Sequence, residues 1–438
     1  MNPIDALQAT IELRIFEYLG GLMLESGSMD PALVDVITDI LKVMTVSTFC
    51  LLIVILLIWL ERKVIARMQD RVGPNRVGGK YGLGQTVADV LKLLTKEDII
   101  PFGADSLTYN IAPLLIVMTA LLMWAVMPFS SNAIGVDLNL GLFYVLSISS
   151  ISVVSLLLAG WGSNNKYALL GAFRSVAQLV SYEVPMILSL LVPMLLARTM
   201  SMQSLITEQD IPYVLVVPLS ALIFFISALA ETGRSPFDLL EAESEIVAGF
   251  HVEYSGMKFA MFFLAEFVST LFMASLFITI YWGGWRFYLL EWLSGGQLST
   301  VELMVGGWNL GPLLGMVTFF VKTFFGYFLF IWARGTFPRV RIDQMMDFNW
   351  KFLVPLSAML VAVVAIIDRI FLDVPPFAEF LLQLGGNLIL GIITIEILRR
   401  VGRRRREAEE GSRQDGPAEA TEHHDHHDHH EMGHAAAH

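Results

Sequence analysis

The sequence predicts an all-α protein, a polytopic bundle of about nine transmembrane helices with one amphipathic helix on the membrane surface. Hydrophobic residues make up 55% of the 438 residues and charged residues only 16%, whereas soluble domains have about a quarter charged residues. The apolar residues form runs close to the ~20 residues that a helix needs to cross a bilayer. No strand-like alternation of useful length interrupts these runs. In a bilayer such runs must be helices, because each backbone group has to pair within its own segment.

The predicted spans follow one another from the first apolar run to the C-terminal tail. Their approximate bounds are Val43–Leu60, Ile111–Phe129, Leu140–Gly162, Ala168–Ala197, Ile211–Ala230, Phe259–Trp282, Pro312–Ala333, Phe352–Ile367 and Phe380–Leu398. The last two are the weakest because they are short or rich in glycine. If the ninth does not cross fully, the tail lies on the opposite side of the membrane.

The distribution of positive charge predicts the orientation. Most of the 29 Lys and Arg residues lie in alternate loops on one side and in the tail, and positively charged loops stay in the cytoplasm. We therefore expect an acidic N-terminal segment, residues 1–40, outside the cell. A transmembrane domain, residues 41–400, follows with cytoplasmic loops at 61–105 and 231–258. Residues 401–438 form a His-rich cytoplasmic tail whose composition predicts disorder, either merely solvated or binding metal.

Composition excludes several classes of protein. Cys50 is the single cysteine and the formal net charge is -12, so the chain lacks the thiols of a disulfide scaffold, an iron–sulfur protein or a typical zinc site. A nucleic-acid binder would be basic, so we expect no nucleic-acid partner. The chain also has no dinucleotide fingerprint. We therefore expect no metal site, no covalently bound cofactor and no catalytic residue of its own for electron transfer.

The first polar segment, Glu61–Asp98, is rich in glycine without being a phosphate loop. A phosphate loop needs Gly six residues before its Lys and Ser or Thr after it, whereas Lys80 has Pro74 and Tyr81 there. We instead expect a tight turn at Gly73–Asn75 and an amphipathic surface helix from about Gln85. Its apolar stripe is Val87, Val90, Leu91 and Leu94. The alternative is a basic loop that only sets the topology.

The second polar segment, Ala230–Lys258, combines clustered acids with apolar residues. Its acidic residues are Glu231, Asp238, Glu241, Glu243, Glu245 and Glu253. The apolar residues among them suggest a folded segment with partly buried carboxylates, which raise one another's pKa. The alternative is a solvated acidic loop.

Charged residues also occur inside the predicted spans, namely Arg174, Glu183, Glu266 and Lys322, with Glu231 at a span end. A charge at mid-bilayer costs at least about 2.5–3.5 kcal/mol, and a functional role is the default hypothesis for it. The mixed signs suggest a proton relay or a hydrated path. Structural ion pairs between helices are the alternative.

Four motifs in these regions carry a specific resemblance. They are ERKVIARMQDRVGPNRVG from Glu61, GAFRSVAQLVSYEVP from Gly171, AETGRSPFDLLEAESEIVAGFHVEYSGMKFAMFFLAEF from Ala230 and WARGTFPRVRIDQMM from Trp332. On these motifs the chain resembles the family of the H-type membrane subunit of NADH–quinone oxidoreductase, respiratory complex I, which is the first subunit in the mitochondrial naming. The first 40 residues and the tail after Arg400 lie outside the resemblance.

The resemblance implies tilted transmembrane helices in a bacterial inner (plasma) membrane, at the junction of the membrane and peripheral arms. It implies a quinone path bordered by Glu61, Arg62, Arg71, Gly73, Pro74 and Asn75. It implies a coupling loop with Glu231, Arg234, Asp238, Glu241, Glu243 and Glu245, and a charged path with Glu183, Glu266 and Lys322. Arg174 is a further charge within a span that we assign to proton coupling.

The resemblance also implies the cofactors and partners. Quinone, either ubiquinone or menaquinone, would be the substrate, while FMN and iron–sulfur clusters would belong to partner subunits. Partners would be the quinone-site subunits of the peripheral arm, small membrane subunits and the lipid bilayer. The chain would thus be a subunit without a redox centre in a proton-translocating NADH:quinone oxidoreductase. The alternatives are the homologous membrane subunit of a hydrogenase or ferredoxin-linked complex, a stand-alone ion transporter and a pure anchor subunit.

Overall fold

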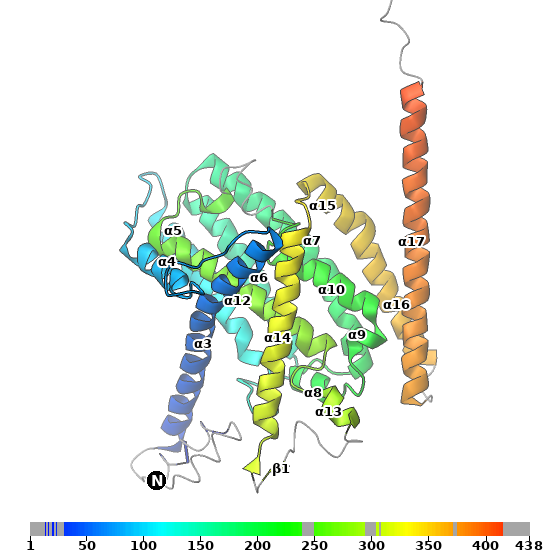
Figure 1. Cartoon of the computed structure of the whole chain (residues 1–438), viewed down its shortest axis with the longest axis horizontal. Coiled ribbons are helices and arrows are strands. Elements are labelled where there is room, and N and C mark those ends of the chain that lie inside the picture. The colour runs from blue at the N-terminus through cyan, green and yellow to red at the C-terminus, as the bar shows by residue number, and fades with distance from the viewer. Residues whose placement is uncertain are drawn as a thin grey trace, which may run out of the picture. The chain divides into compact units, whose positions relative to one another are not determined.

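Long helices make up most of the described chain (Figure 1). The computed structural model describes residues 30–238, 249–293, 304–305, 308–370 and 375–414, together with Arg14, Phe16, Gly20, Gly21 and Met23. Within these residues, 8 helices are long and apolar enough to cross a membrane. The predicted all-α, multi-pass transmembrane fold is therefore confirmed.

The long helices follow the predicted spans. They are α3 (Pro31–Met68), α5 (Ser106–Leu122) with its 3-10 turn η1 (Met123–Val126), α6 (Gly141–Gly162), α7 (Lys166–Ala197), α12 (Gly256–Tyr281), α14 (Gly311–Thr336), the continuous run of α15 (Ile342–Phe348), η3 (Asn349–Leu353) and α16 (Val354–Ile370), and α17 (Pro376–Gln414). Shorter elements connect them: α4 (Gly84–Thr95), α8 (Met202–Thr207), α9 (Tyr213–Val216), α10 (Pro218–Glu231), η2 (Gly249–His251), α13 (Tyr288–Leu293), and the paired strands β1 (Met304–Val305) and β2 (Trp308–Asn309).

Polar caps determine where several helices begin. Asp30 accepts a hydrogen bond from the backbone N–H of Ala32 at the start of α3. Asp105 and Asn165 cap α5 and α7 in the same way. Such caps satisfy backbone donors that have no partner within the helix. As a result α3 begins at Pro31, well before the apolar run predicted from Val43, and includes part of the acidic N-terminal segment.

The fifth predicted span, Ile211–Ala230, is wrong as a single helix. It is divided at Val217, whose φ of -130° and ψ of 64° are not helical, into α9 and α10. Pro218 lacks a backbone N–H and fits the first position of a helix, so a new helix begins there. The 14 residues of α10 span about 21 Å, less than the ~30 Å hydrocarbon thickness.

The predicted surface helix is confirmed as α4. The four apolar residues of its predicted stripe are exposed, between 39% and 57%, as a helix lying on a membrane surface requires. Two contacts fasten this region to α3: Arg62 pairs with Asp89 on α4 at 2.5 Å, and the indole N–H of Trp59 donates to the carbonyl oxygen of Tyr81 at 2.9 Å.

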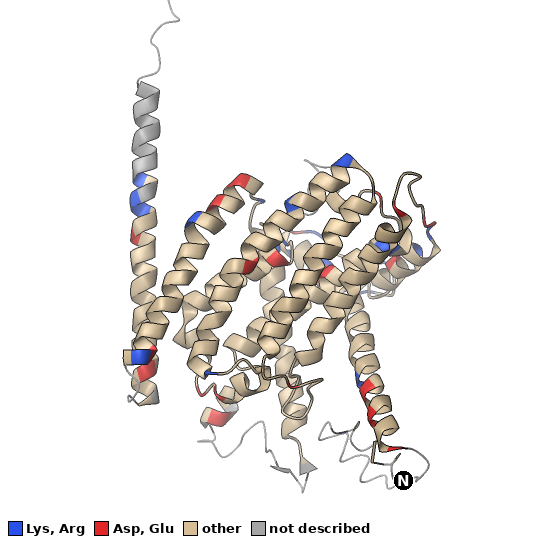
Figure 2. Cartoon of the chain, turned by 180° about the vertical axis from the view of Figure 1, so that it is seen from behind, with Lys and Arg blue, Asp and Glu red and all other residues tan. Residues whose placement is uncertain are grey.

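The chain divides into two compact units, residues 1–388 and residues 389–438. In the first, α12 is the most enclosed of the long helices, and it packs against α3, α5 and α14. In Figure 2 most visible charged residues lie at helix ends and in connecting segments, and a few lie part-way along helices. In the second unit, α17 is helical through Gln414, and the His-rich residues 415–438 lie outside the described part of the chain.

Candidate functional site

A buried ion cluster forms around Glu61, in the cytoplasmic half of α3 as the sequence orients it. Glu61 is only 5% exposed. Its Oε1 accepts hydrogen bonds from Nη1 of Arg234 at 2.6 Å and from Nη1 of Arg334. Its Oε2 accepts one from the Tyr327 hydroxyl at 3.2 Å. One carboxylate therefore joins α3, α14 and the segment that follows α10.

Arg234 extends this cluster to α12. It is 3% exposed, and its Nε lies 3.1 Å from Oε1 of Glu266 in an ion pair that lacks hydrogen-bond geometry. Its guanidinium also stacks 4.7 Å from the ring centroid of Phe267. Burial would lower the pKa of Arg234, but Glu61 and Glu266 outweigh burial and raise it. Two carboxylates and two guanidinium groups thus balance in charge, as a buried ion cluster requires.

A pocket of about 510 Å³ opens beside the cluster. Glu61, Arg62, Arg71, Gly73 and Pro74 line it, together with Arg334 and with apolar residues of α3 and α12. The first five of these, Glu61 to Pro74, belong to the six residues that the resemblance places along a quinone path. Asn75, the sixth, is exposed and does not line this pocket. Apolar walls with a few polar groups are typical of a site for a largely apolar ligand.

A smaller cavity, of about 90 Å³, lies beside Glu266. Glu231, His251 and Glu266 line it among mostly apolar residues. Within the described part of the chain, Oε2 of Glu231 is buried and has no hydrogen-bond partner. Burial lowers the pKa of His251 to about 4, because its ring packs against Phe250 and Phe259. His251 is therefore neutral at pH 7.

The other predicted residues lie around this site or outside the described residues. Glu183 on α7 accepts a hydrogen bond from the Ser150 hydroxyl at 2.8 Å, and Arg174 is half-buried on the same helix. The backbone oxygen of Asp238 accepts a hydrogen bond from Arg339. Glu241, Glu243 and Glu245 fall in residues 239–248, which lie outside the described chain.

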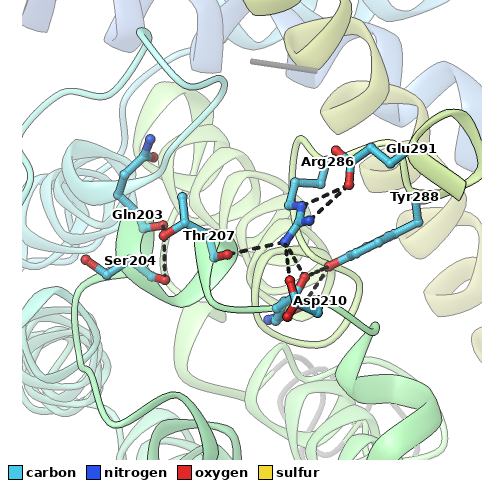
Figure 3. A network of polar contacts seen from close by, with 8 residues as sticks. Gln203, Ser204, Thr207, Asp210, Arg286, Tyr288 and Glu291 are labelled. Carbon is cyan, nitrogen blue, oxygen red and sulfur yellow. Dashed lines mark hydrogen bonds and ion pairs between the residues drawn. The ribbon is translucent and has the colours of Figure 1, made fainter. Parts of the chain in front are cut away.

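Lys322 belongs to a different network from the Glu61 cluster. Its Nζ donates to the carbonyl oxygens of Trp282, Gly284 and Arg286, at 2.9, 3.2 and 2.6 Å. Lys322 and Arg334 lie about 18 Å apart along α14. Figure 3 shows the neighbouring polar contacts, in which Arg286 lies between Glu291 on one side and Thr207 and Asp210 on the other. The structure thus does not bring Lys322 together with Glu266.

Sequence reasoning missed Arg334, Tyr327 and His251 as site residues. Arg334 is a loop charge by position, and Tyr327 is an uncharged residue in a long apolar run. Tyr327 and Arg334 are two helical turns apart on α14 and therefore lie on one face of the helix. This shared face is the sequence pattern that could have indicated both residues. Among the described residues, no group of three or more His, Cys, Asp or Glu side chains is placed to hold a metal ion.

Comparison with known proteins supports the family that the four sequence motifs indicate. The model of the NADH dehydrogenase family matches residues 41–365. The NADH-quinone oxidoreductase H subunit of Dehalococcoides mccartyi (strain CBDB1) is 46% identical over 310 residues, which cover 70% of this chain and 81% of that protein. The protein of that name from Geobacillus kaustophilus is 45% identical over 71% of this chain and 88% of its own length. The one from Chlorobaculum tepidum is 49% identical over 68% and 83%. The chain therefore belongs to the NADH dehydrogenase family, among the H subunits of NADH-quinone oxidoreductase.

Proposed function

We propose that this membrane subunit of respiratory complex I forms much of the quinone-binding chamber and couples quinone reduction to proton translocation. The observation that carries the proposal is the position of Arg234. It pairs with Glu61, which lines the 510 Å³ pocket, and with Glu266, which lines the 90 Å³ cavity. A change of charge in the pocket therefore has a direct electrostatic path to a second carboxylate.

The larger pocket would hold the quinone head group. Reduction of a quinone to a quinol consumes two electrons and two protons, and partner subunits with FMN and iron–sulfur clusters would supply the electrons. Negative charge on the quinone would attract Arg234 and Arg334 away from their carboxylates. At 4 Å and an effective dielectric constant of 20, two unit charges interact by about 4 kcal/mol. This is on the order of three pKa units, enough to change the protonation of a carboxylate near neutral pH.

Glu266 and Glu231 would then carry the proton step. When Arg234 moves toward the quinone, Glu266 loses its positive partner and its affinity for a proton rises. Protonation of the reduced quinone anion to the neutral quinol would remove its negative charge, so that Arg234 returns to Glu266 and Glu266 releases its proton. Glu231 and Glu266 both line the small cavity, where water can bridge polar groups if it finds several partners.

The names of the matched relatives favour this role over the homologous membrane subunit of a hydrogenase or ferredoxin-linked complex. The ubiquinone and menaquinone alternatives share the same head-group chemistry in this scheme. The partners would be the quinone-site subunits of the peripheral arm and small membrane subunits, with this chain in the bacterial inner membrane.

The carboxylates of the cavity give the direct test. Glu231→Gln and Glu266→Gln should each lower NADH:quinone oxidation and proton pumping at least about tenfold, the effect of removing one proton-transfer group. NADH oxidation by an artificial acceptor should persist, because it needs only the peripheral arm. Asp347→Asn is the matched control, since Asp347 is 60% exposed and pairs with Lys351 at the surface. Normal quinone turnover and pumping in both cavity variants would refute the proposal.

A further inference from the structure

Gln178 on α7 connects two points of the segment that leaves α10. Its side chain is completely buried. Its Nε2 donates one hydrogen bond to the carbonyl oxygen of Ala230 at 2.7 Å and another to that of Phe237 at 2.8 Å. Both hydrogens of one amide group are therefore used to hold two backbone positions that bracket Glu231 and Arg234.

The bracketed segment, residues 230–237, is the part of the chain that carries both proposed coupling residues. Its internal backbone hydrogen bonds are short-range, from Gly233 to Ala230 and from Phe237 to Arg234. Such turns do not by themselves fix the segment against the rest of the bundle. Other contacts reach the segment near its middle, where Arg234 pairs with Glu61 and the backbone N–H of Val340 donates to the carbonyl oxygen of Pro236 at 3.1 Å. Gln178 adds a connection from α7 at both ends of the segment, and Tyr182, one turn further along α7, packs its ring 5.2 Å from that of Phe237.

The chemistry of the contact requires an amide at this position. Two carbonyl oxygens need two donors, and a glutamine amide has two N–H groups where a carboxylate has none. Within the described chain, Oε1 of Gln178 is buried without a hydrogen-bond partner. The hydrogen bonds of this side chain in the described structure are therefore those of its donors.

We infer that Gln178 is a positioning residue for proton coupling, which holds residues 230–237 so that Glu231 faces the small cavity and Arg234 reaches Glu61 and Glu266. This inference rests on the proposed function of Glu231 and Glu266. It adds a residue that touches neither the quinone pocket nor the cavity, since Gln178 lines neither.

The test uses Gln178→Leu in the assembled complex and measures both structure and activity. Without the two hydrogen bonds, the backbone amides of residues 232–237 should exchange with deuterium about tenfold faster. The kcat for quinone reduction should fall and its pH optimum should shift, because Glu231 loses its fixed surroundings. The KM for quinone should stay within about twofold, since the pocket keeps its lining.

Asn349→Leu is the matched control. Asn349 is also fully buried and donates its amide to α7, at the carbonyl oxygen of Ser181, whereas the hydrogen bonds of the described residues include none from its side chain to residues 230–237. Its variant should leave deuterium exchange in that segment and the pH optimum unchanged. Gln178→Glu adds a pH test: only its protonated form has a donor, so its excess of exchange over the natural chain at the same pH should shrink as the pH falls.

The outcomes separate this inference from the proposed function. Unchanged deuterium exchange in Gln178→Leu would show that Gln178 does not hold residues 230–237, even if Glu231→Gln and Glu266→Gln abolish pumping. Faster exchange with a normal kcat and pH optimum would overturn the positioning role. Equal effects of Gln178→Leu and Asn349→Leu on exchange in the segment would also overturn it, because the loss would then reflect general loosening of α7.

Discussion

Glu61 is shared by two arginines, so the members of its cluster are not equivalent. Arg234 has a second carboxylate, Glu266, while Arg334 has only Glu61 among the ion pairs of the described residues. Neutralising Glu61 would leave a buried surplus of positive charge, and an uncompensated buried charge is strongly destabilising. The whole cluster therefore depends most on its central carboxylate.

Glu61→Gln should destabilise the subunit by about 3–5 kcal/mol, the usual effect of removing one partner from a buried ion pair. The measurement is the thermal midpoint for dissociation of the purified complex, which should fall by several degrees. Arg62→Met is the control: its pair with Asp89 is partly solvent-exposed, at 42% and 25%, and such pairs contribute about 0–1 kcal/mol. A midpoint for Glu61→Gln as high as that of Arg62→Met would show that Glu61 is not the central charge.

Among single residues, the sequence indicates the charged members of the candidate site more readily than the uncharged ones. Glu266 stands out because a charge inside an apolar run is costly, whereas Glu61 and Arg234 are indicated by the resemblance of their motifs. Tyr327 could not be predicted, since a tyrosine in an apolar run is ordinary until a carboxylate is found opposite its hydroxyl. The pairing of Glu61 with Glu266 through Arg234 joins residues assigned to two separate paths, and only three-dimensional packing shows it.

Among the connecting elements, the turn before α4 depends on backbone geometry that glycine permits. Gly82 has a φ of +68°, and a Cβ there would lie 2.2 Å from the carbonyl oxygen of Pro74. Gly79 has a similar φ of +86°, but a Cβ there would meet no atom within 4 Å. The two positions thus share the same conformational strain on substitution and differ in steric conflict.

Gly82→Ala should therefore raise the KM for quinone several-fold, because it displaces Pro74 and with it one wall of the 510 Å³ pocket. Gly79→Ala should cost only the strain of a left-handed residue, about 1–2 kcal/mol, with little change in KM. Steady-state kinetics in membranes with a soluble quinone measures both variants. Equal KM values for the two alanine variants would refute a role of this turn in shaping the pocket.

The elements themselves were predictable where apolar runs are long. The surface helix α4 was found from its apolar stripe, and the spans from their length. Helix ends were not, because caps such as Asp30 and polar residues such as Arg67 extend a helix past its apolar run. The prediction of one helix over the fifth span is wrong at Pro218. An apolar run can contain a proline without looking interrupted, but in the structure Pro218 begins the separate short helix α10.

Across the whole molecule, the predicted orientation places residues 61–105 in the cytoplasm and residues 198–210 outside. Cys50, the single cysteine, is buried, so we expect the natural chain to react little with thiol reagents. Lys80 and Arg403 are exposed on the predicted cytoplasmic side. Asp210 is exposed on the predicted outer side, with 84% of its side chain accessible.

An impermeant maleimide applied to intact spheroplasts should label Asp210→Cys and leave Lys80→Cys and Arg403→Cys unlabelled until the membrane is opened. The expectation follows from the excess of Lys and Arg in the predicted cytoplasmic loops. The natural chain is the control and should stay unlabelled throughout. Labelling of Arg403→Cys from outside would contradict the predicted crossing of the ninth span, and labelling of Lys80→Cys would contradict the whole orientation.

The balance of charge in the Glu61 cluster has a further consequence. The charges of its two carboxylates and two guanidinium groups sum to zero while all four are ionised. A single proton gained or lost leaves one whole elementary charge in a region of low dielectric, where its potential extends over many ångströms. In the proposed mechanism, the cluster would therefore exert a long-range field on its surroundings only when its protonation changes.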